Sequence, residues 1–350
     1  MSAPRPTLRS LAAKLGVSPM TVSLALRNSH EVSAKTRRRI QRLARTEGYR
    51  PDPTISKLMH HLRLRAPKRS AANICAIGQR DPPHSQWNGF IERMIAGMRH
   101  RAEALGYAFS TIEIENDESR ATLPRVLHSR GIDGLAILPP RRVSDFRDLV
   151  DWREFSTVAA TSAVVAPVFH RVMPNHFDNM LTACQALTAA GFRRIGLAVS
   201  SDFNRRVLYR WTGGIAWHHE FGGTTAVRTF VGRQDVRIID VDPLRKWLTR
   251  EKPDAIISDI NERPALSAAI AHLPARRRPQ LFHMSWPDPA GEPGIDQRPE
   301  QLGSVAIEVL AGMLARGEKG VPDLPSSSMV DGRWMSGQIT PPSAPDLVRP

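Results

Sequence analysis

The sequence predicts a small all-α N-terminal domain followed by a larger α/β domain made of two doubly wound parallel-sheet lobes. Residues 8–48 carry apolar side chains at helical spacing between glycines, and from residue 73 onward strand-like apolar runs alternate with helical stretches. The chain has 350 residues, which is more than one usual domain. Several domains, at least one of them with a sizeable core, are therefore expected.

The N-terminal stretch has the start and stop residues of three short helices. Gly16 ends the first helix, and Ser18 can cap the second. Pro19 lies in the first turn of the second helix, where a backbone N–H has no partner within the helix, so the N–H that proline lacks is not missed. Ser33 can cap the third helix, and Gly48 ends it. Two short helices joined by a short turn that contains a glycine form a helix-turn-helix, whose second helix lies in the major groove of DNA.

The rest of the chain repeats a strand–helix pattern. Strand-like runs lie at 74–78, 109–114, 134–138, near 157, and at 195–199, 227–231, 255–259 and 280–284. Helical stretches, such as the one over 87–105, separate these runs. Repeated βα units form parallel sheets whose ligand sites lie at the carboxyl ends of the strands, and two such halves enclose a cleft.

The positive charge is concentrated at the N-terminal end of the chain. The formal net charge is +15; residues 1–70 hold 16 Lys and Arg but only three acidic residues, whereas the remaining residues hold 33 Lys and Arg against 31 acidic residues. A basic segment on a nearly neutral body indicates a nucleic-acid-binding head. A membrane surface is the competing partner, but the segment lacks bulky aromatic residues that would insert into lipid.

The cysteines and the apolar segments indicate a cytoplasmic protein. Cys75 and Cys184 are the only cysteines; they cannot form a CxxC-type metal cluster, and two thiols in so long a chain suit a reducing compartment. The N-terminus lacks the apolar core of a signal peptide, and no stretch approaches the roughly 18 apolar residues of a membrane span.

The sequence lacks the usual signatures of an enzyme. It contains no GxSxG, HExxH or GxxxxGK[ST] motif. The adjacent pairs His60–His61 and His218–His219 cannot point at one metal from a helix or a strand. We therefore predict no catalytic residue, no metal site and no cofactor.

The N-terminal motifs resemble those of the DNA-binding head and hinge of the lactose/galactose repressor (LacI/GalR) family. The motifs that fall at the family's spacing are Gly16-Val17-Ser18, Thr21-Val22-Ser23, Val32-Ser33, Thr36-Arg37 and Gly48-Tyr49-Arg50-Pro51. The resemblance implies a bacterial transcriptional regulator, a repressor, that acts in the cytoplasm at the nucleoid. It also implies a homodimer on a pseudo-palindromic double-stranded operator.

By this resemblance, three apolar residues stand at the base-reading positions of the second helix: Pro19, Met20 and Leu24. Base reading would then depend on thymine methyl groups or on DNA shape. Leu24 has an alternative role, which is to pack inward. Thr21 and Ser23 match positions near the DNA backbone. The complete set of DNA contacts that we predict is Ser18, Pro19, Met20, Thr21, Ser23, Leu24, Arg27, Thr36 and Leu58.

Residues 52–59 resemble the family's hinge helix. Leu58 stands where the family has a side chain that wedges into the minor groove, which unstacks a base step and bends the DNA. The alternative is an ordinary apolar helix residue. Ile55 replaces the family's usual Ala, which affects how closely two hinge helices can approach.

Residues 73–340 resemble the periplasmic-binding-protein-like sensor domain of the same family, less closely than the head does. The resemblance implies a small-molecule effector, a sugar or sugar derivative, between the lobes. Arg210 is the leading candidate because a guanidinium binds carboxylate, phosphate or vicinal hydroxyls in a planar, bidentate way; a salt bridge is its alternative role. Core packing and helix capping are the alternatives for the aromatic and acidic candidates. The effector-binding set that we predict is Trp87, Asp178, Arg210, Asn261, Trp286 and Asp288.

The expected domain division follows from the resemblance and from the change of composition after residue 72. It consists of a head at 1–50, a hinge and linker at 51–72, a sensor and dimerisation domain at 73–340, and a tail at 341–350. Within the sensor, one lobe covers about 73–173 and 297–325, and the other covers about 174–296 and 326–340. The tail has no heptad pattern, so a dimer is expected rather than a tetramer.

Two other function classes stay open at this stage. Apolar base-reading positions would also suit an architectural protein that binds DNA with low specificity. A solute-binding protein or an α/β enzyme is the second alternative. An export signal would indicate the solute-binding protein, and turnover with a catalytic carboxylate of perturbed pKa would indicate the enzyme.

Overall fold

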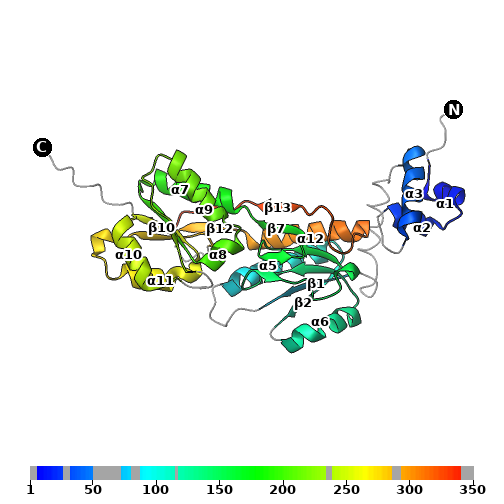
Figure 1. The fold of residues 1–350 in the computed structure, drawn as a ribbon, viewed down its shortest axis with the longest axis horizontal. Coiled ribbons are helices and arrows are strands. Elements are labelled where there is room, and N and C mark those ends of the chain that lie inside the picture. The colour runs from blue at the N-terminus through cyan, green and yellow to red at the C-terminus, as the bar shows by residue number, and fades with distance from the viewer. Residues whose placement is uncertain are drawn as a thin grey trace.

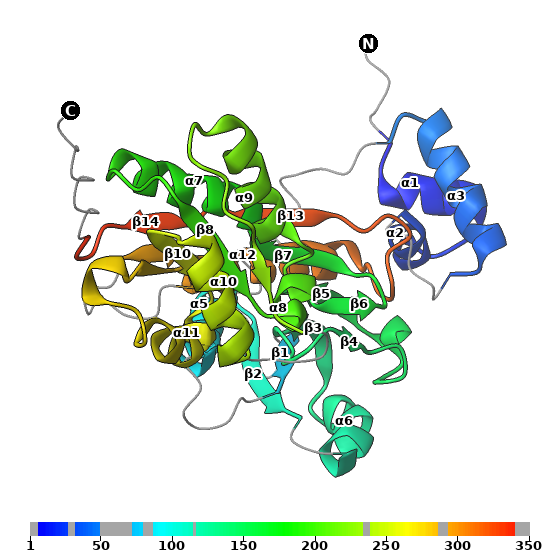
Figure 2. The ribbon, with the colours of Figure 1, turned by 60° about the vertical axis from the view of Figure 1, so that its left-hand side comes forward.

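A computed structural model of the chain describes residues 6–26, 32–49, 72–79, 87–114, 117–233, 239–285 and 293–339. These residues form a three-helix head and an α/β body with two six-stranded sheets (Figures 1 and 2). The predicted fold class is thereby confirmed. None of the described helices is long and apolar enough to cross a membrane.

The head packs its three helices around one small apolar core. They are α1 (Leu8–Leu15), α2 (Pro19–Leu26) and α3 (Ala34–Thr46). Val22 and Ala25 on α2 are completely buried against Leu11 of α1 and Ile40 of α3. Burial of this stripe from each helix stabilises the bundle, because a short helix gains most of its stability from packing.

The predicted helix boundaries of the head are confirmed by the caps. The backbone of Gly16 adopts a left-handed φ of 65°, which a glycine adopts without the Cβ penalty of other residues. The hydroxyl of Ser18 accepts a hydrogen bond from the Thr21 N–H at 3.0 Å, and Ser33 accepts one from the Thr36 N–H at 3.3 Å. Each cap satisfies a backbone donor that the first turn of a helix leaves unpaired.

The first sheet of the body consists of six parallel strands in the order β13-β7-β5-β3-β1-β2. Their bounds are β1 (Asn73–Gly78), β2 (Ala108–Glu113), β3 (Ile132–Ile137), β5 (Ser156–Ala159), β7 (His170–Pro174) and β13 (Ser327–Val330). A two-stranded ladder of β4 (Ser144–Asp145) and β6 (Val164–Ala166) lies beside it.

The second sheet has the order β14-β12-β11-β10-β8-β9, and only β14 is antiparallel to its neighbour. The bounds are β8 (Ile195–Val199), β9 (Phe230–Val231), β10 (Ala255–Ser258), β11 (Gln280–His283), β12 (Gly294–Asp296) and β14 (Arg333–Met335). The expected strand at 227–231 is shorter than predicted. Side chains of the neighbouring helix, Glu251 and Trp247, bind the backbone N–H and carbonyl of Arg228 in place of a strand partner.

Helices cover both faces of each sheet, so each lobe has two apolar cores. The first lobe contains α5 (Trp87–Ala104), α6 (Asp117–Ser129) and α12 (Pro299–Arg316). The second lobe contains α7 (His176–Ala189), α8 (Ser201–Arg206), α9 (Arg210–Phe221), α10 (Val241–Glu251) and α11 (Arg263–Ile270). Short 3₁₀ turns complete the body at η2 (Trp152–Glu154), η3 (Ile260–Glu262) and η4 (Ala275–Arg277).

The main chain passes between the lobes after β7, after β12 and after β13. The last of these crossings corrects the predicted division, which assigned 326–340 to the second lobe. The strand β13 pairs with β7 of the first sheet, from Ser327 beside Arg171 to Val330 beside Pro174. The first lobe therefore extends to Val330, and β14 of the second lobe begins at Arg333.

Candidate DNA-reading helix and interlobe cavity

The N-terminal end of α2 presents three exposed residues. Ser18, Pro19 and Met20 are exposed, and the Met20 side chain has 63% of its surface accessible. The Ser18 hydroxyl also lies 2.8 Å from the Thr21 hydroxyl, so the cap holds the first turn of α2 in place. An exposed helix N-terminus of this kind can enter a DNA groove.

The next turn of α2 is partly committed to the core of the head. Leu24 is half-buried and packs against the core, in agreement with the alternative role of packing inward. Thr21 and Ser23 are half-buried, and Thr36 accepts a hydrogen bond from the Ser33 hydroxyl at 2.9 Å. The two other predicted DNA contacts, Arg27 and Leu58, lie outside the described residues.

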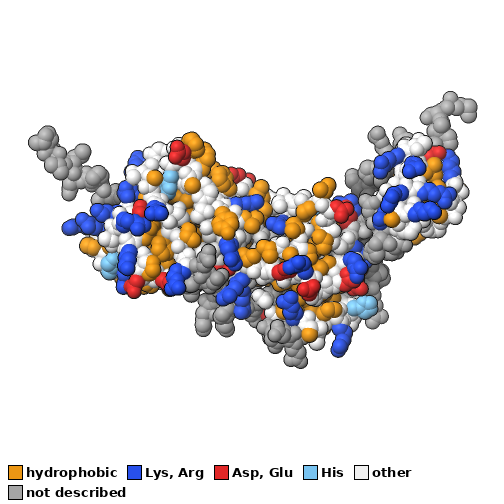
Figure 3. All heavy atoms as spheres, in the orientation of Figure 1, with side chains coloured by type: hydrophobic (Ala, Val, Ile, Leu, Met, Phe, Trp, Pro, Cys, Tyr) orange, Lys and Arg blue, Asp and Glu red, His pale blue; other side chains and the backbone are white. Residues whose placement is uncertain are grey.

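Basic side chains cover the visible face of the head (Figure 3). The exposed Lys and Arg of the described head are Arg9, Lys14, Lys35, Arg38, Arg39, Arg42 and Arg45. The ammonium of Lys14 pairs with the carboxylate of Glu47 at 2.6 Å. This surface can neutralise phosphates and position α2 without carrying sequence information.

A cavity lies between the two lobes of the body; together with the solvent space at its open side it measures about 420 Å³. In the first lobe it is lined by α5 and by the loops that follow β3 and β5. In the second lobe it is lined by the start of α7, by α8, and by the residues that follow β11 and β12. The ligand site of a doubly wound fold is expected at these carboxyl ends of parallel strands.

A neutral histidine forms part of the cavity wall. The Nδ1 atom of His176 accepts a hydrogen bond from the indole N–H of Trp211 at 3.2 Å. Burial lowers the pKa of His176 to about 3, and the charges of Arg210 and Arg206 lower it as well. The imidazole is therefore neutral at pH 7 with its proton on Nε2, since an N–H donor can bond only an unprotonated Nδ1.

A buried hydrogen-bonded network supports the second-lobe side of the cavity. The amide of Gln297 donates to the Ser285 hydroxyl at 3.2 Å, and that hydroxyl donates to Asp259 at 3.3 Å. Asn261 donates to the other Asp259 oxygen through its side-chain amide at 2.7 Å and its backbone N–H at 3.1 Å. Burial raises the pKa of Asp259. Asn261 therefore positions Asp259 behind the wall, whereas Ser285 and Gln297 form the wall itself.

The predicted effector residues that the structure describes do not line this cavity. Asp178 is exposed in the first turn of α7 and accepts a hydrogen bond from the side-chain amide of Asn175 at 2.6 Å, but no side chain caps the backbone at the start of this helix. Arg210 is half-buried at the start of α9, and its guanidinium contacts the sulfur atoms of Met173 at 3.1 Å and Met329 at 3.7 Å.

The structure does not describe the side chains of the other three predicted effector residues. Trp87 is the first residue of α5, but its side chain is not among those described. Trp286 and Asp288 lie outside the described residues. The description of the second lobe stops at Ser285, which lines the cavity, and resumes at residue 293.

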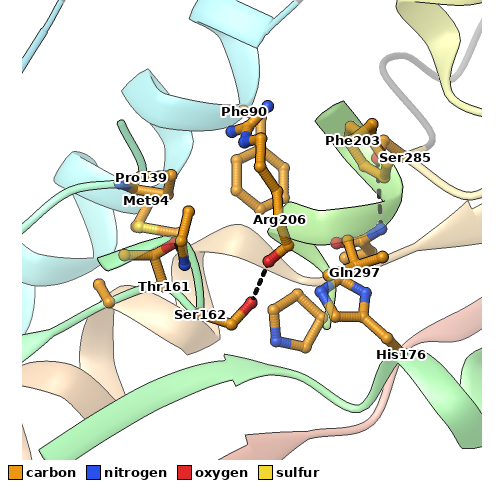
Figure 4. A pocket seen from close by; sticks show the side chains of 14 residues that line it. Phe90, Met94, Pro139, Thr161, Ser162, His176, Phe203, Arg206, Ser285 and Gln297 are labelled. Carbon is orange, nitrogen blue, oxygen red and sulfur yellow. Dashed lines mark hydrogen bonds between the residues drawn. The ribbon is translucent and has the colours of Figure 1, made fainter. Parts of the chain in front are cut away.

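Sequence reasoning missed the polar residues that do line the cavity. Arg206 ends α8, and His176 begins α7, each a few residues after a strand. Figure 4 shows the lining side chains of the two lobes on opposite sides of the cavity, with Arg206 between them. A signal was available for His176, which lies just after the carboxyl end of β7, but not for Arg206, which lies at the far end of the helix that follows β8.

The buried carboxyl of Glu262 leads to a prediction about pH. Burial, together with the nearby charge of Asp259, raises the pKa of Glu262 to about 7, and the side chain accepts a hydrogen bond from the Ile239 N–H at 2.8 Å. The folded state therefore retains a proton that the unfolded state loses near pH 4.5. This contribution to stability is complete below pH 4.5 and is lost as the pH rises through about 7.

We expect Glu262→Gln to raise the free energy of unfolding by about 3 kcal/mol at pH 8 and to change it little at pH 4, because the amide needs no proton to stay neutral. Urea denaturation of the full chain at both pH values measures the difference. The exposed Glu220→Gln on α9 is the matched control and should show no such pH dependence. An equal effect of Glu262→Gln at pH 4 and pH 8 would contradict the prediction.

The head matches a known family of DNA-binding proteins. The family model described as "Bacterial regulatory proteins, lacI family" matches residues 7–52, which include α1, α2 and α3. The head is a lacI-family domain. Among the residues that the structure describes, no group of three or more His, Cys, Asp or Glu is placed to hold a metal ion.

Two curated proteins that the chain resembles are transcriptional regulators. The HTH-type transcriptional regulator IpsA of Corynebacterium glutamicum is 26% identical over 192 residues, which is 55% of this chain and 51% of that protein. The HTH-type transcriptional repressor CytR of Escherichia coli K12 is 27% identical over 213 residues, which is 59% of this chain and 57% of that protein. The chain thus spans about half the length of the curated relatives it matches.

Solved structures share the fold at lower sequence identity. The lac repressor dimer bound to operator and the anti-inducer ONPF has a TM-score of 0.53 and 18% identity, with 95% of this chain and 98% of that chain covered. The transcriptional regulator CelR–cellobiose complex has a TM-score of 0.55 and 18% identity, with 95% and 99% covered. These similarities establish that the chain shares the fold of both proteins.

Proposed function

We propose that this protein is a sequence-specific DNA-binding transcriptional repressor whose operator affinity is modulated by a small molecule held between its two lobes. The observation that carries the proposal is the presence, in one chain, of a lacI-type head and of a cavity lined by both lobes. The exposed residues of α2 and the basic surface of the head support DNA binding. The cavity at the strand ends supports a ligand site.

The coupling between ligand and DNA follows from the position of the cavity. A ligand in it contacts α5 of the first lobe and α8 of the second, so its binding favours one relative arrangement of the lobes. We propose that this arrangement changes whether the predicted hinge helices at 52–59 are ordered; these residues lie outside the described ones. By linkage, the ligand then changes DNA affinity by the same factor as DNA changes ligand affinity.

The protein acts in this proposal as a homodimer on a pseudo-palindromic operator of double-stranded DNA, in the cytoplasm and at the nucleoid. A two-fold symmetric dimer presents two copies of α2, and these fit half-sites about one helical turn apart. The head occupies 1–50 and the tail 341–350, and the DNA contacts are those predicted from the sequence, from Ser18 to Leu58. Crosslinking and sequencing of bound genomic DNA tests the proposal.

A repressor of this kind should produce discrete peaks that share a two-fold motif in such an experiment. An architectural protein of low specificity is the second candidate, and it is favoured by the apolar base-reading positions and by the half-burial of Leu24. That protein should produce broad coverage without a shared motif.

We expect Leu58→Gly to weaken operator binding by at least about tenfold, because a bent operator repays the cost of unstacking through added contacts. Fluorescence anisotropy with a labelled operator measures the affinity. The melting temperature should change little, and Leu58→Met, which keeps an apolar wedge, should bind nearly as well as the wild type. Equal affinities of Leu58→Gly and wild type would show that Leu58 does not act as a wedge.

A further inference from the structure

The guanidinium of Arg210 connects the two lobes through two sulfur atoms. Arg210 begins α9 of the second lobe, and its Nη1 lies 3.1 Å from the Sδ of Met173 and 3.7 Å from the Sδ of Met329. Both methionines belong to the first sheet, where Met173 on β7 pairs with Met329 on β13. A thioether sulfur is a weak hydrogen-bond acceptor, so this contact between the lobes is weak.

The two sulfur atoms differ in their access to solvent. Met329 lies on β13, the outermost strand of the first sheet, and has 51% of its surface exposed, whereas Met173 has 1%. A dissolved oxidant can therefore reach the sulfur of Met329 but not that of Met173, although the same guanidinium contacts both. Oxidation converts a thioether to a sulfoxide, and specific reductases reverse the reaction.

Positive charge gathers beside the exposed sulfur. Arg171 lies two residues before Met173, on the same face of β7, and burial together with the charge of Arg210 lowers the pKa of Arg171. Asp331, the acidic residue nearest to Met329 along the chain, accepts a hydrogen bond from the side chain of Asn175 at 2.8 Å. Within the described residues, the contacts of the Arg210 guanidinium are to sulfur and not to a carboxylate. An oxygen atom with partial negative charge would be stabilised at this position.

We propose that Met329 is a site of reversible oxidation by a peroxide, and that its sulfoxide strengthens the contact between the first lobe and Arg210 of the second. The thioether sulfur attacks one oxygen of hydrogen peroxide; an S–O bond forms, the O–O bond breaks, and the sulfur loses two electrons to the peroxide. The leaving hydroxide takes the proton of the transferred OH group and departs as water. The nearby guanidinium stabilises the negative charge that develops on the leaving oxygen.

The sulfoxide differs from the thioether in how well it accepts a hydrogen bond. Its oxygen is polar, and a hydrogen bond from a guanidinium to an oxygen acceptor is charge-assisted. Because Arg210 belongs to the other lobe, oxidation of Met329 should stabilise the lobe contact, which is opposite to the usual effect of methionine oxidation on a folded protein. The inference goes beyond the proposed function, in which a ligand in the cavity is what shifts the lobes.

The first experiment treats the full chain with a limiting dose of hydrogen peroxide and locates the sulfoxides by peptide mass spectrometry. Met329 should be oxidised well before Met173, because only its sulfur is open to solvent. The melting temperature of the treated protein should rise by about 2–4 °C, because the new hydrogen bond joins a charged group. Treatment with methionine sulfoxide reductase should restore the original melting temperature.

Variants identify the two partners. Arg210→Leu removes the donor, so oxidation should no longer raise the melting temperature. Met329→Leu removes the sulfur and keeps an apolar side chain of similar volume, so the rise should again be absent. Met173→Leu is the matched control, and the rise should persist because the Met173 sulfur is not oxidised. Oxidation of another exposed methionine, such as Met20, is common to all these proteins and cancels in the comparison.

Three results would overturn the proposal: equal oxidation rates of Met329 and Met173, a fall in melting temperature when Met329 is oxidised, or an equal rise in wild type and Arg210→Leu. If Arg210→Leu does not fold, Met329→Leu carries the test, since an equal rise without the sulfur would contradict the proposal as well. These measurements use no DNA. Their outcome is therefore independent of whether the head selects an operator, on which the proposed function depends.

Discussion

Raising the salt concentration from 50 to 200 mM is expected to weaken operator binding by about 10³- to 10⁵-fold, if the head neutralises six to ten phosphates. The reason is the release of condensed counterions, one for each phosphate that a Lys or Arg neutralises. The head carries the surface for this, since residues 1–70 hold 16 Lys and Arg. Anisotropy titrations at several salt concentrations give the slope of log affinity against log salt.

Charge removal from the head should flatten that slope, and equal charge removal from the body should not. Lys35→Gln with Arg38→Gln changes two exposed cations of α3. Arg276→Gln with Arg277→Gln changes two exposed cations of η4 in the second lobe and is the matched control. A flat salt response of the wild type would remove DNA binding by the head altogether.

Gly97→Ala is expected to destabilise the first lobe by about 3 kcal/mol or more, which is at the upper end of overpacking effects. The helices α5 and α12 cross in backbone contact: a Cβ at Gly97 would overlap the carbonyl of Glu300, and one at Gly303 would overlap the carbonyl of Met94. Neither backbone can move away without disturbing the core that α5 and α12 form with the first sheet. Urea denaturation measures the loss.

The same helix provides the control for this prediction. Gly89 also lies on α5, but a Cβ there meets no atom within 4 Å. Gly89→Ala should therefore stabilise the protein slightly, by up to about 1 kcal/mol, because alanine favours a helix more than glycine does. Similar losses in both variants would mean that helix propensity, and not the close crossing, decides the effect.

The parts of the fold that could be predicted are those with strong local signals. The helix ends at Gly16 and Ser33 depend on a left-handed φ and on a cap, which few residue types provide. The runs that became β1, β8 and β10 are buried on both faces, and such strands appear in sequence as continuous apolar runs.

The strands that escaped prediction lack that signal. β7 contains His170, Arg171 and Pro174, and β14 contains Arg333, so neither has the apolar run of a central strand. β13 has exposed residues at Ser327 and Met329, and only its pairing with β7 assigns it to the first lobe. Such pairing connects residues far apart in the chain, which local patterns do not reveal.

The cavity lies between the lobes, where the sequence predicts an effector, but the predicted residues that the structure describes do not line it. Position matching selected Arg210, whereas Arg206 lines the cavity. Between them, Leu208 and Tyr209 adopt left-handed φ values of 54° and 58°, a conformation unusual for residues that are not glycine. This turn separates α8 from α9 and directs the two arginines to different surroundings. Neither residue type signals such a turn.

Selection of a binding site from random duplex DNA at about 150 mM salt tests DNA recognition by this chain most directly. The full-length protein is incubated with the random pool, and the retained DNA is sequenced. We expect enrichment of a pseudo-palindromic site whose half-sites lie about one helical turn apart, because a two-fold dimer presents two α2 helices. Retention of DNA without any enriched sequence would contradict a specific repressor, and would mean that Pro19, Met20 and Leu24 do not distinguish base pairs.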